Sequence, residues 1–273
     1  MGALFGSLTA LSIGMADLFG RHVVNRRGPI IAAAVIQAVG IVASLLLLTV
    51  IASEWVGIDV VVGVASGIGL GVGLWGYLSG LGVSSSAVVS PIVATMSAVI
   101  PFVYAIARGA DASMWAVMGA VVAIGGLVLV SMGGGPVANV AAGIRWSVIS
   151  GCGYGFGLSI IIEATEASGA WPAVAQRVGA LSLMVVVAIR AEVGFELVGV
   201  RLAGVASGVF SALSTVFYLL GVQADATPAV VTASMFPAVT VVVGRFVYHD
   251  VVTRRQLLGI VIVLAGVTGV VAL

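Results

Sequence analysis

The chain has 273 residues, of which 61% are hydrophobic and only 8% are charged, and its mean hydropathy is +1.28. Because a soluble domain carries roughly 25% charged residues, this composition excludes a water-soluble globular protein. A net charge of +1, without a basic segment beside aromatic residues, gives no indication of a nucleic-acid partner. We therefore expect the lipid bilayer to be the main partner of this chain.

Apolar runs of about 20 residues, the length that crosses about 30 Å of hydrocarbon, follow one another along the chain. They predict an all-α polytopic protein of the inner or plasma membrane with ten transmembrane helices. The predicted spans are 2–21, 30–52, 60–81, 87–107, 113–132, 145–163, 173–190, 200–221, 228–248 and 256–273. The connections are short, and the joint "MGGGPVANVAAGI" at 132–144 falls between the fifth and sixth spans. No soluble domain is expected.

The sequence repeats itself at about half its length. "GVASG" at 63–67 recurs at 204–208, a shift of 141 positions (204 − 63). "AVIQAVG" at 34–40 aligns with "AVAQRVG" at 173–179, and Gly119 aligns with Gly259, at nearly the same shift. We predict one five-helix repeat over 1–135 and a second over 140–273. Since five is an odd number, the second repeat enters the membrane with inverted polarity, an arrangement that underlies many secondary transporters.

The repeated phrase itself is predicted to serve helix packing. Helices in lipid gain little from burying apolar side chains and associate through small residues that let their backbones approach. "GVASG" has small residues four positions apart, and the glycines at 67–73 continue the pattern. We expect the spans 60–81 and 200–221 to be interior helices, and we do not interpret the phrase as a binding motif.

The closing segment resembles the EamA-type branch of the drug/metabolite transporter (DMT) superfamily. "PAVVTASMFPAVTVVVGRFVYHDVVTRRQLLGIVIVLAGVTGVV" looks like the last two helices of that family, with a proline at Pro237 and an acid at Asp250. Arg177 resembles the arginine early in the second helix of a repeat. The first repeat departs from the pattern, with Ala110 in place of the acid and Ile13-Gly14 in place of the usual Trp-Gly. The resemblance covers essentially the whole chain.

This resemblance implies a carrier of small organic solutes, such as amino acids, other metabolites or drugs, and commonly an exporter that works by alternating access. It leaves the substrate, the coupling ion and the choice between monomer and homodimer open. Family members usually keep both termini in the cytoplasm. Here the arginines predict both termini outside, because short loops rich in arginine stay inside. Either one span is miscounted or this chain is inverted relative to the family, and we favour the inversion. The arginines on or near the side opposite the N-terminus are Arg21, Arg26, Arg27, Arg145, Arg190, Arg201, Arg245, Arg254 and Arg255, and the other side has Arg108 alone.

Asp17 is the acid that lies well inside an apolar run. An intramembrane acid is a candidate for binding a cationic group or carrying a proton. The alternative is an ion pair with Arg21, four residues later in the favourable acid-first order. The first interpretation makes the carrier proton-coupled, whereas the second favours facilitated diffusion.

Two glutamines occupy equivalent places in the repeats, Gln37 and Gln176. Each is predicted either to line a cavity or to cross-link helices, because a glutamine facing lipid is costly. Arg177, beside Gln176, is predicted either to meet an anionic substrate group or to extend to the membrane interface.

The aromatic candidates for a substrate pocket are Tyr77, Tyr154, Phe156 and Tyr218. Aromatic residues near helix ends are alternatively interfacial anchors, and Tyr154 is the deepest of the four. Met96 and Met235 are candidate soft lining, with simple packing as the alternative. Pro91, Pro101 and Pro237 are candidate helix bends for gating, although membrane helices also tolerate proline without any gating role.

Several function classes lack their motifs. The chain has no HExxH, GxSxG or phosphate-binding loop, and "GVGLWG" at 71–76 fits a dinucleotide motif only formally because it lies inside a span. No metal or other cofactor is expected. The leading hypothesis is therefore a non-enzymatic secondary transporter, and the alternative is a non-transporting membrane subunit or receptor with a carrier-derived fold.

Overall fold

The computed structural model describes residues 1–49, 51–109, 114–131, 139–194, 196–233 and 235–272. Over these residues the chain is all-helical. Its elements are α1 (Gly2–Arg27), α2 (Pro29–Leu47), α3 (Gly57–Val83), α4 (Ser86–Ala107), α5 (Met114–Ser131), α6 (Val140–Ile161), the short 3₁₀ turn Glu166–Ser168, α7 (Trp171–Arg190), α8 (Arg201–Ala233), α9 (Phe236–Val247) and α10 (Arg254–Ala272). The predicted ten helices are confirmed, while most of the predicted joint at 132–144 lies outside the described residues.

The boundaries differ most at the eighth and ninth helices. The spans predicted at 200–221 and 228–248 leave a connection at 222–227, but this stretch belongs to α8, and α9 begins only at Phe236. Pro237 therefore lies in the first turn of α9 and does not interrupt the helix as predicted. Proline costs little there, because the first N–H groups of a helix have no intrahelical partner.

Within the described part of the chain, four helices, α1, α2, α3 and α7, are long and apolar enough to cross a membrane, and shorter apolar stretches lie in α4, α5 and α9. Large apolar side chains are exposed on every one of the ten helices, from Leu4 and Leu11 on α1 to Leu257 and Leu258 on α10. The buried set includes many serines as well as Gln37 and Asp59. An apolar exterior around a partly polar interior is the pattern of a membrane protein.

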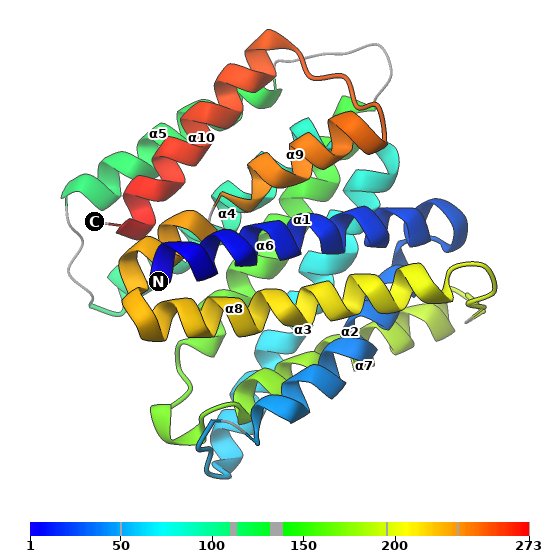
Figure 1. The fold of residues 1–273 in the computed structure, drawn as a ribbon, viewed down its shortest axis with the longest axis vertical. Helices are drawn as coiled ribbons and strands as arrows, with labels where there is room; N and C mark the ends of the chain where they lie inside the picture. Colours follow the sequence, from blue (N-terminus) through cyan, green and yellow to red (C-terminus); the bar gives the residue numbers. More distant parts are fainter. Residues whose placement is uncertain (50, 110–113, 132–138, 195, 234, 273) are drawn as a thin grey trace.

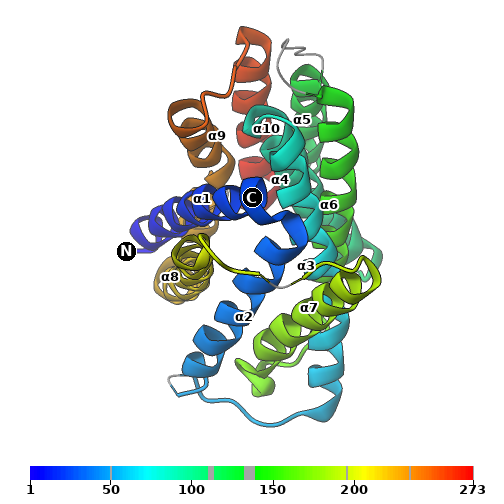
Figure 2. The same ribbon diagram turned by 90° about the vertical axis from the view of Figure 1, so that its right-hand side faces the viewer.

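The helices surround the centre of the molecule. In Figure 2, α1, α8 and α9 lie on one side and α3, α4 and α6 on the other. The pair α5 and α10 closes one end of the long axis, and α2 with α7 closes the other end (Figure 1). The start of α1 and the end of α10 lie at the left in Figure 1. The opposite end, where α1 and α7 end and α8 and α10 begin, carries Arg27, Arg190, Arg201, Arg254 and Arg255 and is called here the arginine-rich end.

The two copies of "GVASG" make equivalent contacts. A Cβ atom at Gly63 or Gly67 would collide with the backbone of α7, and one at Gly204 or Gly208 would collide with valine side chains of α2. The hydroxyl of Ser66 donates to the Gly157 carbonyl of α6 at 2.6 Å. That of Ser207 donates to the Ala16 carbonyl of α1 at 2.7 Å. Donors and acceptors are both related by the same shift of 141 positions, so the phrase holds crossing helices together in both halves.

The helices α3 and α6 approach most closely through glycine. A Cβ atom at Gly69 would lie 2.6 Å from the backbone nitrogen of Gly157, and one at Gly153 would lie 2.6 Å from that of Gly73. These contacts involve backbone on both sides, so neither helix can yield by rotating a side chain. The four glycines therefore set the separation of the two helices, as small residues do in membrane proteins generally.

A Gly69→Ala variant is expected to lower the melting temperature of the purified protein by about 2–12 °C. Overpacking costs about 1–3 kcal/mol, and each 1 kcal/mol corresponds to roughly 2–4 °C in a chain of this size. Gly125→Ala is the matched control, because nothing lies within 4 Å of a Cβ atom there. Since alanine favours a helix, that variant should melt at the original temperature or slightly above it. Equal shifts in the two variants would contradict the close approach of α3 and α6.

Candidate functional site

A cavity of about 380 Å³ lies in the centre of the helix bundle. Eight helices contribute to its wall, and the described residues of α5 and α10 do not reach it. Most of the wall is apolar, including Ile13, Leu70 and Leu74. The polar lining residues are Asp17, Tyr77, Ser97, Tyr154, Gln176, Arg177, Ser211, Ser214 and Thr215. The volume falls in the range of small-molecule sites, which also combine an apolar wall with a few polar groups.

Asp17 lies on α1 and accepts two hydrogen bonds. The Tyr77 hydroxyl of α3 and the Thr240 hydroxyl of α9 each donate to the carboxylate at 2.6 Å. A third hydroxyl, that of Ser90 on α4, lies 3.0 Å from the Tyr77 hydroxyl. The carboxylate of α1 thus contacts α3 and α9 directly and α4 only through Tyr77, and these neutral donors hold it at the cavity wall.

The predicted ion pair between Asp17 and Arg21 does not form. Arg21 instead binds Asp250, with N–O distances of 2.8 and 3.0 Å. The i, i+4 spacing brings Asp17 and Arg21 to one face of α1, but the bidentate pair with Asp250 offers a guanidinium a better geometry. Of the two interpretations of Asp17, the ion pair with Arg21 disagrees with the structure. The interpretation in which Asp17 binds a cationic group or a proton stays a prediction.

Arg177 lies on α7 and lines the same cavity. It donates to the side-chain oxygen of Gln37 at 3.0 Å, to Thr215 at 3.3 Å and to Ser211 at 3.5 Å. The guanidinium packs against Gly40 of α2, where a Cβ atom would lie 3.1 Å from Nη1. The alternative in which Arg177 extends to the membrane interface is therefore wrong, because the side chain turns toward α2 and α8.

Neither charge in the cavity has an ionic partner among the described residues. The ion pairs that the described residues form are Arg21–Asp250, Arg27–Glu196 and Arg108–Glu163, and none of these residues lines the cavity. Charged groups withdrawn from water normally find an opposite charge, because neutral donors and acceptors replace only part of the lost hydration. An acid and a guanidinium that share one cavity without being paired are therefore available to a ligand with charges of its own.

The two glutamines adopt different roles. Gln176 lines the cavity and donates to the Ser66 hydroxyl at 2.7 Å, so it also joins α7 to α3. Gln37 does not line the cavity and is only 1% exposed. Its oxygen accepts from Arg177, while its Nε2 has no hydrogen-bond partner in the described part of the chain. Gln37 thus acts on the cavity by orienting Arg177.

Of the aromatic candidates, Tyr77 and Tyr154 line the cavity, whereas Phe156 and Tyr218 do not. Phe156 is 49% exposed on the outside of α6, and Tyr218 is 38% exposed on α8. Residues two apart on a helix point in opposite directions, which explains why Tyr154 faces inward and Phe156 outward. Tyr218 follows Tyr77 by the same shift of 141 positions, but Tyr77 is buried at the cavity wall whereas Tyr218 is exposed.

Neither methionine candidate lines the cavity. Met96 packs on Gly151, between α4 and α6, and Met235 is exposed where α8 passes into α9. Pro91 and Pro101 lie inside α4, which continues through both, and the Thr95 hydroxyl donates to the Pro91 carbonyl at 2.9 Å. A gating role for the prolines stays a prediction.

Sequence reasoning missed the hydroxyl groups around the two charges. Thr240 binds Asp17 as directly as Tyr77 does, and Ser211 and Thr215 flank Arg177. The sequence signal for such residues is a hydroxyl side chain inside an apolar run. This chain has serine or threonine in many apolar runs, so the signal does not single out these three. Within the described residues, no group of three or more His, Cys, Asp and Glu side chains could hold a metal ion.

Comparison with known proteins extends the result on the fold. No protein-family model matches the sequence, and no curated protein matches it. Thirteen chains of solved structures match the fold. One, a crystal structure of a protein, superimposes with a TM-score of 0.61 over 98% of this chain and 95% of its own, at 16% sequence identity. The likeness shows that the fold is shared along the whole chain.

Proposed function

We propose that this protein is a secondary membrane transporter that carries small zwitterionic organic solutes, such as amino acids, through the central cavity. The observation that carries the proposal is the presence of Asp17 and Arg177 in one cavity, neither of them with an ionic partner among the described residues. A carboxylate suits an ammonium group, and a guanidinium suits a carboxylate, which it can bind with two parallel hydrogen bonds. A zwitterion supplies both groups.

The size and the remaining lining agree with such a solute. A cavity of about 380 Å³ accommodates a molecule of the size of an amino acid. Leu70, Leu74 and Tyr154 provide an apolar and aromatic wall for a side chain. We expect apolar and aromatic amino acids to be carried better than polyanions, for which the cavity has a single cation.

Alternating access is supported by equivalent contacts in the two predicted repeats. The hydrogen bonds Ser66–Gly157 and Ser207–Ala16 join residues that are related by the same shift of 141 positions in the sequence. The contact of Gly126 with Gly259 likewise corresponds to that of Gly266 with Gly119. Two similar halves around a central cavity can exchange conformations, so that the cavity opens to each side in turn. This architecture and the resemblance of the closing segment both favour an EamA-type carrier of the DMT superfamily, with α1–α5 and α6–α10 as inverted repeats in a cell membrane.

The test is uptake into liposomes that contain the purified protein, with labelled solutes in three groups. One group holds amino acids, the second holds amines without the carboxylate, and the third holds carboxylic acids without the ammonium group. We expect saturable uptake above that of empty liposomes, strongest for the amino acids. Uptake of none of the three groups would sink the proposal and favour a non-transporting membrane subunit or receptor.

A further inference from the structure

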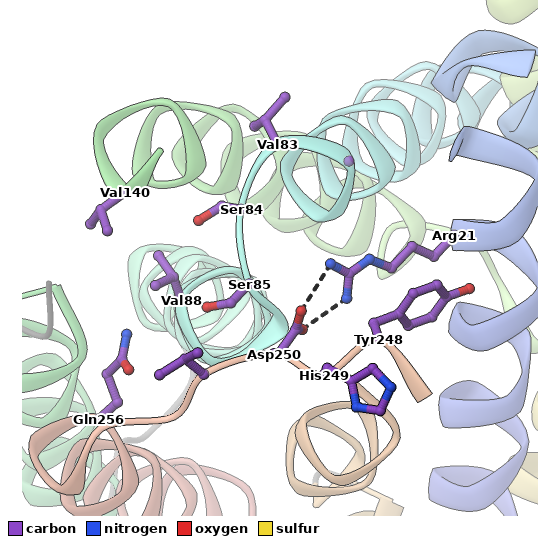
Figure 3. A pocket seen from close by; sticks show the side chains of 12 residues that line it. Arg21, Val83, Ser84, Ser85, Val88, Val140, Tyr248, His249, Asp250 and Gln256 are labelled. Carbon is purple, nitrogen blue, oxygen red and sulfur yellow. Dashed lines mark hydrogen bonds and ion pairs between the residues drawn. The ribbon is translucent and has the colours of Figure 1, made fainter. Parts of the chain in front are cut away.

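Toward the arginine-rich end, the central cavity is followed by a narrow space and then by a second pocket. The narrow space has a volume of about 10 Å³ and shares Asp17 with the cavity. It shares Arg21 and Tyr248 with the outer pocket, which has about 230 Å³ (Figure 3). A volume near 10 Å³ holds at most one water molecule. The three spaces thus lie in series, with a constriction that a solute cannot pass.

Arg21, Ser86 and Tyr248 line the constriction. Asp250 lies on the outer-pocket side and binds both Arg21 and Ser86. The bidentate pair joins α1 to the segment between α9 and α10, and Figure 3 shows the Arg21 guanidinium turned toward the Asp250 carboxylate, with both bonds dashed. The same Asp250 carboxylate accepts from the backbone N–H and the hydroxyl of Ser86 at 3.0 and 2.8 Å. It thereby caps the first turn of α4, where a helix favours a negative charge.

Tyr248 fixes the position of Arg21. Its ring lies under the guanidinium, 4.3 Å from centroid to Cζ, and its hydroxyl donates to the Leu18 carbonyl of α1 at 2.7 Å. The Arg21–Asp250 ion pair also needs a glycine at position 244, because a Cβ atom there would lie 2.6 Å from a carboxylate oxygen of Asp250. Burial alone raises the pKa of Asp250, but the hydrogen bonds from Arg21 and Ser86 hold this pKa below its ordinary value, so the carboxylate is charged at neutral pH.

Resting on the proposed transport function, we propose that Arg21, Asp250, Tyr248 and Ser86 form the gate that closes the cavity toward the arginine-rich end. Three segments meet there: α1, the start of α4 and the connection from α9 to α10. Breaking the pair in this buried position leaves one charge uncompensated, and that charge is stabilised only if the end opens and admits water. The outer pocket is the vestibule through which a solute passes between the gate and the arginine-rich side.

The gate can be tested without any substrate. Ser97 on α4 lines the cavity, so Ser97→Cys reports its accessibility to a membrane-impermeant maleimide. The background carries Cys152→Ser, which removes the sole native thiol. Vesicles that present the arginine-rich end to the reagent are identified by labelling of Arg190→Cys, an exposed position at the end of α7.

In these vesicles we expect slow labelling of the cavity thiol, and a rate about tenfold higher or more after Arg21→Gln or Asp250→Asn. Combining both substitutions should raise the rate less than their separate effects predict, because no charge is then left alone. The matched control is Arg27→Gln, at the end of the helix that also carries Arg21. It breaks an exposed ion pair with Glu196 and should leave the rate unchanged.

A milder variant covers the case in which the charge variants do not fold. Tyr248→Phe keeps the ring under Arg21 and removes only the bond to Leu18, and a smaller rise in rate is expected. Rates that stay at the original value in the folded variants would overturn the gate. Because labelling needs no flux, this failure is distinct from that of the transport proposal, which a lack of solute uptake would show.

Discussion

Replacing Asp17 with asparagine is expected to reduce the uptake of ammonium-bearing solutes by about ten- to a hundredfold and to preserve the fold. A hydrogen bond to a charged group contributes about 1.5–3 kcal/mol, and 1.36 kcal/mol corresponds to tenfold. Asparagine retains the acceptor that faces the hydroxyls of Tyr77 and Thr240, both at 2.6 Å in the native protein. Only the negative charge is lost. The measurement is initial uptake into liposomes as a function of solute concentration.

The same variant separates solute binding from proton coupling. If Asp17 carries the proton, a pH gradient accelerates uptake by the native protein and has no effect on Asp17→Asn. Uptake that keeps its dependence on the gradient in the variant would remove Asp17 from the coupling step.

The matched control for Asp17 is Asp59→Asn. Asp59 is also a buried acid in an apolar helix, but it accepts from Thr165 at 2.6 Å and does not line the cavity. We expect this variant to lose stability and to keep its preference among amino acids, amines and acids. A change of preference equal to that of Asp17→Asn would show that loss of any buried acid is enough, which contradicts a specific role for Asp17.

The helices could be predicted from the sequence because their signal is local. An apolar run of about 20 residues has few alternatives to a helix in lipid, since each backbone polar group must be satisfied within the segment. The boundary between α8 and α9 is harder to predict, because a polar stretch with a proline is also typical of a loop. Pro237 marks the first turn of a helix, and neither hydropathy nor proline alone distinguishes a start from an interruption.

The candidate site could be predicted only in part, because its decisive contacts join residues far apart in the chain. The i, i+4 spacing on a helix suggests Asp17 as the ionic partner of Arg21. It gives no information about Asp250, which lies 229 positions from Arg21 in the chain. Helical geometry alone also leaves open which of Tyr154 and Phe156 faces the centre, until the neighbours of α6 are known. The repeat shows equivalent positions, but Asp17 corresponds to Leu158 and Arg177 to Ala38, so the charges are where the halves differ.

Replacing Arg177 with glutamine is expected to produce the opposite selectivity from Asp17→Asn. Uptake of amino acids and carboxylic acids should fall by about ten- to a hundredfold, because the charged donor for a carboxylate is lost. Uptake of amines should persist, because Asp17 is unchanged. Arg177→Lys should recover only part of the uptake, since lysine restores the charge without the fork that binds two carboxylate oxygens. Measurement of all three solute groups with each variant gives the full comparison.

The control for Arg177 lies on the same helix. Arg190 is exposed at the end of α7 and has no part in the cavity, so Arg190→Gln should leave all three uptakes unchanged. The position of Arg177 also depends on Gln37, whose oxygen accepts from the guanidinium. Gln37→Leu should therefore weaken uptake of carboxylate-bearing solutes and leave that of amines unchanged. A parallel loss of all three solute groups in the Arg177 variants would mean that Arg177 supports the helix packing, and the assignment of the two charges to the two ends of a zwitterion would be wrong.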